Sequence, residues 1–167
     1  IHLNNFTTAS YNKWFKEKNP CPFCSEEQIN NFHVILSCPL VLKLWTDIEP
    51  FLIKILPKPV TIEEMAFGIA GDTKPIIFRN WLTFLMRDCI SAQEKRAFHN
   101  QLGEGNTRHI EHTFNARVKR EVIDAYQLLT YLQKRDLFFR SYNPKDTFLI
   151  NLTGEVNEQN IPNIFSL

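Results

Sequence analysis

Apolar residues recur at helical spacing along most of this chain, and capping residues mark where the helices should begin. Residues 8–18 carry three aromatic side chains on one face and end at an Asn-Pro breaker. A helix is expected over residues 25–37, because Ser25 and Gln28 have the spacing of a capping box. Pro39 then suits the first turn of a helix whose apolar residues repeat every four positions, and a Pro-rich stretch should end that helix.

Two further helices are expected in the middle of the chain. Thr61 and Glu64 form a second capping box, and Gly68 can close this short helix in a left-handed conformation. The next helix opens at Pro75, and apolar side chains cover so much of its surface that we expect it at the centre of the core. Cys89 falls on its apolar stripe and is expected to be a core residue.

The last third of the chain predicts one long amphipathic helix and a weakly structured end. Polar residues 103–106 predict a loop, after which apolar residues keep a helical period from residue 108 to about residue 140. Residues 147–152 favour a short strand. The remaining Asn-rich segment is predicted to lack structure of its own.

Composition and charge narrow the possible functions. With 167 residues, 44% of them apolar, the chain can bury one core of ordinary size. A net charge of +1 gives no bulk attraction to nucleic acid, so any such contact must come from local patches. No run of about eighteen apolar residues exists, and no membrane contact is expected. The chain opens at Ile1 without an initiator Met, which favours a segment of a longer polypeptide.

Three of the four cysteines gather with a histidine in residues 21–38. Cys21 and Cys24 have the C-x2-C spacing that lets two thiolates take adjacent corners of a tetrahedron, and His33 and Cys38 supply two more ligands. Thiolate and imidazole suit zinc or iron, and a complete set of four closes the site to substrate. We therefore expect a structural Zn²⁺ site, with Cys38 placed where the helix carrying His33 ends or turns.

Two alternatives to a metal site are open. Disulfides would require an oxidising compartment, which glycosylation sequons at Asn5 and Asn151 mildly support. The thiols and His33 could instead be packed in a helical core, as cysteines often are. We favour the metal because disulfides leave His33 without a role.

With its flanking residues, this cluster resembles the Cys-Cys-His-Cys (CCHC) zinc-binding segment near the C-terminus of non-LTR (LINE-type) retrotransposon reverse transcriptases. The resemblance is specific over about residues 8–56 and weaker to about residue 92. The helices expected around residues 8–18 and 79–90 are also similar to what flanks that segment. The residues that carry the resemblance are CPFC at positions 21–24, His33, Cys38-Pro39 and Leu44-Trp45.

The resemblance implies a non-catalytic C-terminal region that engages template RNA or target DNA during target-primed reverse transcription. Its implied partner is the reverse transcriptase domain of the same polypeptide, and its implied location is intracellular, in the cytoplasm or the nucleus. The Tyr/Phe-x-Asp-Asp signature of the polymerase does not occur in this chain. We therefore expect no enzymatic activity in this segment.

Basic residues near aromatic ones form two candidate surfaces for nucleic acid. Both sets are modest, and solvated helix faces are the alternative, since that is the usual place of Lys and Arg. The first set is Lys13, Lys16 and Lys18 beside Trp14. The second set lies on the first turns of the long predicted helix and comprises Arg108, His112, Arg117, Lys119 and Arg120.

A scaffold or protein-interaction domain is the competing hypothesis. The near-neutral charge suits that role, and the long helix could pack against the polymerase or pair two copies into a homodimer. In either case we expect a mostly α-helical, irregular domain in three parts. Residues 1–56 would form the CCHC zinc module with its flanking helices, residues 57–140 a helical region packed on it, and residues 141–167 a partly extended or disordered tail.

Overall fold

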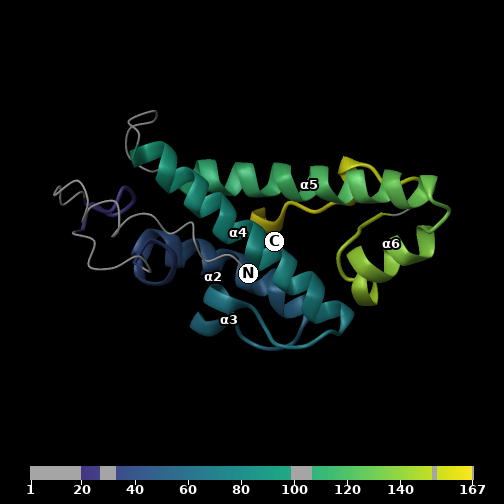
Figure 1. Ribbon diagram of the computed structural model, residues 1–167, viewed down its shortest axis with the longest axis horizontal. Helices are drawn as coiled ribbons and strands as arrows, with labels where there is room; N and C mark the ends of the chain where they lie inside the picture. Colours follow the sequence, from purple (N-terminus) through teal and green to yellow (C-terminus); the bar gives the residue numbers. More distant parts are fainter. Residues whose placement is uncertain (1–19, 27–32, 99–106, 152–153, 167) are drawn as a thin grey trace.

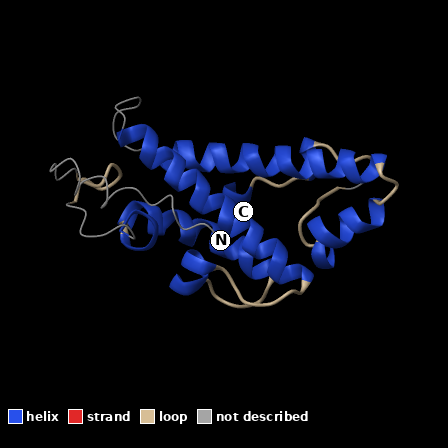
Figure 2. Ribbon diagram, in the orientation of Figure 1, coloured by secondary structure: helices blue, strands red, loops and turns tan. Residues whose placement is uncertain are grey.

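The computed structural model describes residues 20–26, 33–98, 107–151 and 154–166, and within them the fold is helical, without strands (Figures 1 and 2). The mostly α-helical class expected from the sequence is confirmed. The α-helices are α2 (Pro39–Ile55), α3 (Ile62–Phe67), α4 (Lys74–Phe98), α5 (Thr107–Tyr131) and α6 (Arg135–Tyr142). The shorter elements are a π-helix, η1 (His33–Ser37), and the 3-10 turns η2 (Pro144–Asp146), η3 (Glu158–Asn160) and η4 (Ile164–Ser166).

Helix α4 lies at the centre of the fold, as its broad apolar surface predicted. In Figure 1 it runs diagonally between α5 on one side and α2 and α3 on the other, and it also contacts α6 and η1. Buried side chains recur every four residues from Phe78 to Ile90, whereas Ile77 and Phe84 of the same broad stripe are exposed. Cys89 is buried, as expected.

The helix start predicted at Ser25 is wrong. Ser25 takes a φ of 62°, in the left-handed region, whereas a helix cap has extended backbone. Residues 27–32 of that expected helix lie outside the described residues, and its last turn is the π-helix η1. The next prediction is confirmed, because Pro39 occupies the first turn of α2.

The ends of α3 follow the predicted chemistry with one exception. Thr61 Oγ1 accepts a hydrogen bond from the backbone N–H of Glu64 at 3.2 Å, and Gly68 closes the helix with a φ of 79°. The carboxylate of Glu64, however, does not complete the capping box. It pairs with Arg79 of α4 instead.

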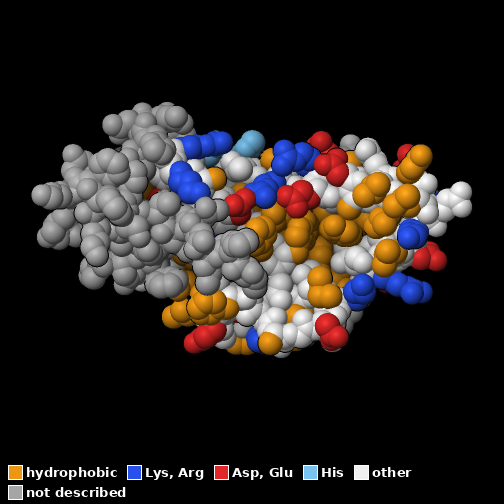
Figure 3. All heavy atoms as spheres, in the orientation of Figure 1, with side chains coloured by type: hydrophobic (Ala, Val, Ile, Leu, Met, Phe, Trp, Pro, Cys, Tyr) orange, Lys and Arg blue, Asp and Glu red, His pale blue; other side chains and the backbone are white. Residues whose placement is uncertain are grey.

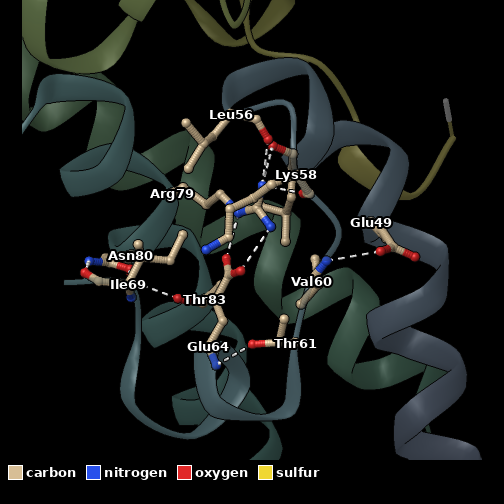
Figure 4. Close-up of polar contacts among 11 residues, drawn as sticks. Glu49, Leu56, Lys58, Val60, Thr61, Glu64, Ile69, Arg79, Asn80 and Thr83 are labelled. Carbon is tan, nitrogen blue, oxygen red and sulfur yellow. Dashed lines mark hydrogen bonds and ion pairs between the residues drawn. The ribbon is translucent and has the colours of Figure 1, made fainter. Parts of the chain in front are cut away.

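The ion pair between Arg79 and Glu64 is buried, with side chains at most 1% exposed (Figure 4). Arg79 Nε and Nη2 donate to the two carboxylate oxygens at 2.5 and 2.8 Å. Its Nη1 donates to the carbonyl oxygens of Leu56 and Lys58 at 2.6 and 2.9 Å, and to that of Leu52 at 3.2 Å. One guanidinium thus ties α3 and α4 to the end of α2.

The long helix expected over residues 108–140 is two helices, α5 and α6, which pack against each other. The chain reverses at Gln133, whose φ is 57°. Gln133 N donates to Thr130 O at 3.0 Å, and Lys134 N donates to Leu129 O at 2.7 Å. This pair of hydrogen bonds defines a Schellman motif, which usually places glycine at the left-handed position. A glutamine there gave the sequence no helix-stop signal.

The end of the chain contributes aromatic and aliphatic side chains to the core. Residues 147–151 do not form the expected strand. Phe148 lies between Phe51 of α2 and Phe78 of α4, with ring centroids 5.8 and 5.0 Å away. Ile161 and Ile164 are buried as well. The segment packs through these side chains without pairing into a sheet.

Near the end of the chain, asparagine side chains form hydrogen bonds to backbone groups that no helix or sheet pairs. Asn143 Oδ1 accepts from the backbone N–H groups of Phe148 and Leu149, both at 2.9 Å. The side chain of Asn160 donates to the carbonyls of Ile150 and Asn151 at 3.0 and 2.9 Å. Buried backbone groups need partners, and these amides supply them where no helix or sheet does.

One cluster of buried apolar side chains runs through the described chain, from Cys21 to Ile164. It draws on all three parts expected from the sequence, and the division at residues 56 and 140 stays a prediction. No helix in the described part of the chain combines the length and apolar character that a membrane span requires.

Candidate metal centre

Cys21 and Cys24 are presented by a tight turn. Ser25 N donates to Cys21 O at 2.8 Å, and Cys21 N donates to Glu26 O at 2.7 Å. The left-handed backbone of Ser25 lets the chain double back within so few residues. The turn therefore brings both thiols to one place.

The π-helix explains how His33 and Cys38, five positions apart, reach the same site. In an α-helix such residues point about 140° apart, because each turn takes 3.6 residues. A π-turn bonds residues five apart and so brings them nearer to one side. Cys38 N donates to His33 O at 2.6 Å, which is that bond. Cys38 then forms the N-cap of α2, so it lies where one helix ends and the next begins.

The four ligand atoms lie within 4.8 Å of one another. The Sγ atoms of Cys21 and Cys38 are 3.9 Å apart, and Cys24 Sγ is 3.3 Å from His33 Nε2. In a tetrahedral zinc site with zinc–sulfur bonds of ~2.3 Å, two sulfurs are about 3.8 Å apart. Three sulfurs and one imidazole at these distances fit a tetrahedral metal ion.

Burial makes this a closed site. Cys21 and Cys38 are at most 1% exposed and His33 is 8% exposed, while Cys24 is half-buried. A catalytic metal keeps an open position for water or substrate, whereas a structural metal has all its positions filled by protein. These four side chains could fill all four positions of a tetrahedral ion, which is the pattern of a structural rather than a catalytic metal.

The alternatives to a metal fit less well. All four cysteines are free, and the 3.9 Å between the Sγ atoms of Cys21 and Cys38 far exceeds the ~2.05 Å of a disulfide bond. The imidazole of His33 points its Nε2 at a thiol, which neither a disulfide nor simple packing requires. These four side chains could hold a metal ion.

The protonation of the thiols depends on their neighbours. A hydrogen bond to Cys38 and burial raise the pKa of the Cys21 thiol, and burial raises the pKa of Cys24. The pKa of Cys38 is lowered, first by the hydrogen bond from Cys21 and also by backbone N–H groups at the start of α2. Without a cation, Cys38 is the first of the three to become a thiolate. A bound dication would displace the protons from the other two.

Two neighbours hold the ligands in place. Ser37 Oγ lies 3.4 Å from His33 Nδ1, which leaves Nε2 directed at the cluster. Trp45 Nε1 donates to Ile35 O at 3.2 Å and so ties η1 to α2. Neither role was predicted from the sequence. The spacing of four between His33 and Ser37 is a signal that could have revealed the first.

The candidate nucleic-acid-binding residues fall into three groups in the structure. Lys13, Trp14, Lys16 and Lys18 lie outside the described residues. Arg117 forms ion pairs with Asp88 of α4 and with Glu121, the latter at 3.1 Å. The other four from α5 line one hollow of about 710 Å³: Arg108, His112, Lys119 and Arg120.

Three residues from the end of the chain share this hollow and were missed by the sequence analysis. They are Glu158, Asn163 and Phe165. No local pattern links them to α5, because they are brought there by long-range packing. Ile164 N donates to Asn115 Oδ1 at 3.0 Å, which places this segment against the helix.

Comparisons with protein-family models, with curated proteins and with solved structures found no significant match to this chain. The chain is a helical fold with a closed site of three cysteines and one histidine that could hold a metal ion.

Proposed function

We propose that this chain is a zinc-dependent, non-catalytic module that binds nucleic acid for the reverse transcriptase of a non-LTR retrotransposon. The observation that carries the proposal is the closed cluster of Cys21, Cys24, His33 and Cys38. These are the residues on which the resemblance to the reverse transcriptase segment rests. Four protein side chains would fill every position of a tetrahedral ion, which supports an architectural role.

Bound zinc would supply the positive charge that offsets three thiolates, two of them buried. In small fingers such sites contribute roughly 10–16 kcal/mol in apparent terms, which is comparable with the whole stability of a typical domain. The protein would position the four metal-binding side chains through the tight turn at residues 21–26 and the π-helix that begins at His33. The metal would thereby join the start of the described chain to α2.

Nucleic acid would be held by basic side chains on phosphates. Arg108, His112 and Arg120 are exposed on α5, and the lysines at positions 13, 16 and 18 precede the metal cluster in sequence. With about six phosphate contacts, affinity should fall by ~10³ between low and moderate salt.

The test is a fluorescence anisotropy titration of the zinc-loaded chain against labelled RNA and DNA at several salt concentrations. We expect binding that weakens steeply with salt, and we expect the Cys38→Ser chain to lose it together with its metal. A zinc-loaded, folded chain that shifts neither RNA nor DNA at low salt would contradict the proposal.

A protein-interaction role is the second candidate, and exposed apolar side chains favour it. Figure 3 shows apolar surface gathered at the end of the molecule formed by α5 and α6. Light scattering on the purified chain tests it, because a stable dimer without affinity for nucleic acid would favour this role. The exposed side chains are Leu128, Tyr131, Leu132 and Leu137, of which Tyr131 is 84% exposed.

A further inference from the structure

The hollow beside α5 is a groove with two walls. One wall is α5 from Arg108 to Asp124, and the other is the chain end that carries Glu158, Asn163 and Phe165. In Figure 1 this yellow segment follows α5. We call this hollow of about 710 Å³ the α5 groove. At 1.5 Å per residue, its helical wall is about 24 Å long.

The second wall is held in place by specific contacts. The backbone N–H of Ile164 bonds to Asn115, and the ring of Phe165 meets Phe114 edge-on with centroids 5.8 Å apart. Phe165 is only partly buried and lines the groove. An aromatic ring therefore lies in the half of the groove near Asn115, among basic side chains of α5.

The charge of the groove is balanced. A uniformly basic surface would attract any polyanion, but carboxylates would repel the phosphates of a duplex, whose Watson–Crick edges are paired and turned inward. The groove thus lacks the net positive charge that favours binding a duplex through its phosphates alone. The lining cations are Arg108, Lys119 and Arg120, joined by His112, and the lining carboxylates are Glu111, Asp124 and Glu158.

An unpaired strand offers chemistry that this mixture can use. Its phosphates suit Lys119 and Arg120, and an open base face can stack on the ring of Phe165. Amino groups of unpaired bases are free to donate hydrogen bonds, and the carboxylates of Asp124 and Glu158 can accept them. Each kind of side chain in the groove then has a counterpart on the ligand.

We propose that the α5 groove binds a short stretch of single-stranded nucleic acid, with one base stacked on Phe165. The inference rests on the proposed function and specifies the strand state and the residues that recognise it. RNA and DNA share this chemistry, so both are probes in the test.

The experiment compares a labelled single strand of about 12 nucleotides, as RNA and as DNA, with the matching duplex. Phe165→Leu keeps an apolar side chain against Phe114 but removes the ring, and we expect it to weaken single-strand binding about tenfold. Duplex binding should not change. Arg120→Gln should lower the salt dependence of single-strand binding by about 0.7 in log–log slope, the value for one phosphate contact.

The matched control is Arg140→Gln, which removes an exposed arginine from α6 outside the groove and should leave binding as it was. Asp124→Asn gives an independent check, because removing a carboxylate should improve duplex binding more than single-strand binding. Melting curves establish that each variant is folded.

The experiment distinguishes failure of the proposed function from failure of the groove assignment. If the unaltered chain binds neither probe, the proposed function falls and the groove assignment falls with it. If it binds a single strand while Phe165→Leu and Arg120→Gln behave like Arg140→Gln, the groove assignment is wrong and the proposed function stands. A duplex bound more tightly than the single strand would also overturn the assignment.

Discussion

Helix α2 is held at both ends by buried polar side chains, and the two ends differ in what they need. At its start, Cys38 belongs to a cluster of four metal-ligand side chains. At its end, Arg79 donates to the carboxylate of Glu64 and to the carbonyl of Leu56. The first arrangement could hold a cation from solution, whereas the second carries its own cation in Arg79.

The two ends of α2 differ in how charge is accommodated in the protein interior. Buried charges are costly unless they are paired and hydrogen-bonded. Arg79 meets that condition, because Nε, Nη1 and Nη2 all donate to acceptors within the chain. The thiols of Cys21 and Cys24 instead have raised pKa values, which favour their neutral, protonated form in the absence of a metal. The start of α2 should therefore depend on metal, and its end should not.

Removing the metal should produce the largest effect. A strong chelator, or Cys38→Ser, should unfold the turn before Ser25 and η1, since structural zinc contributes roughly 10 kcal/mol or more in small fingers. Each kcal/mol lost lowers the melting temperature of a domain of this size by about 2–4 °C. Circular dichroism melts and metal analysis measure both consequences.

Cys89→Ser is the control for that experiment, because Cys89 is buried in α4 outside the cluster. It should retain one metal ion per chain, even if the buried hydroxyl costs stability. If chelator leaves the melting curve of the unaltered chain unchanged, the start of α2 does not depend on metal.

Glu64→Gln should produce the next largest effect. It leaves Arg79 buried without a counter-charge, which in comparable cases costs about 3–5 kcal/mol. Urea unfolding measures the loss, and the metal content should stay the same because the cluster is at the other end of α2. Glu63→Gln, at the exposed neighbouring carboxylate, should change stability little. If the two variants have equal free energies of unfolding, the ion pair between Arg79 and Glu64 does not contribute to stability.

Lowering the pH should weaken the metal site in particular. The raised pKa values of Cys21 and Cys24 mean that at neutral pH at least two protons must leave when a metal binds. Affinity should therefore fall by at least about 100-fold for each unit of pH lost, tenfold per proton released. Titration with a competing chelator between pH 8 and about pH 6 measures this slope. A slope near zero would show that the thiols are already ionised.

Trp45→Phe should have the smallest effect of the four. It removes the indole N–H that bonds Ile35 O, and an unsatisfied buried carbonyl costs about 1–3 kcal/mol. Because η1 carries His33, the loss should appear as weaker metal binding. Trp81→Phe is the matched control, since its indole bonds Glu121 across α4 and α5, away from the cluster. If both variants bind metal equally well, Trp45 has no part in holding the site.

Local features of this chain were predictable because their causes are local. Pro39 at the first turn of α2, the Thr61 cap and the glycine that ends α3 each follow from residues within one helical turn. The four residues that could hold a metal were predictable for the same reason, since the C-x2-C pair lies within one turn and His33 and Cys38 follow it closely in sequence. Within the described residues, one tight turn and one π-turn bring them within 4.8 Å of one another.

Features that depend on distant residues were not predictable. Gln133 takes a left-handed conformation that sequence patterns assign to glycine, and it does so because α6 packs back on α5. Arg79 gave no sign that it would be buried, since its partners lie 15 to 27 positions away. The asparagines near the end of the chain suggested disorder, although they supply hydrogen bonds to buried backbone.

The sequence by itself determined the helical class, most helix starts and the four residues that could hold a metal ion, because hydrogen bonds within a turn and ligand spacing operate over a few residues. Only the tertiary structure decided which faces are buried, where the long helix breaks and how the chain end meets α5. Those outcomes depend on apolar burial and pairing between segments far apart in sequence. Asn115 and Ile164 are joined by a hydrogen bond across 49 positions, a distance at which no spacing rule applies.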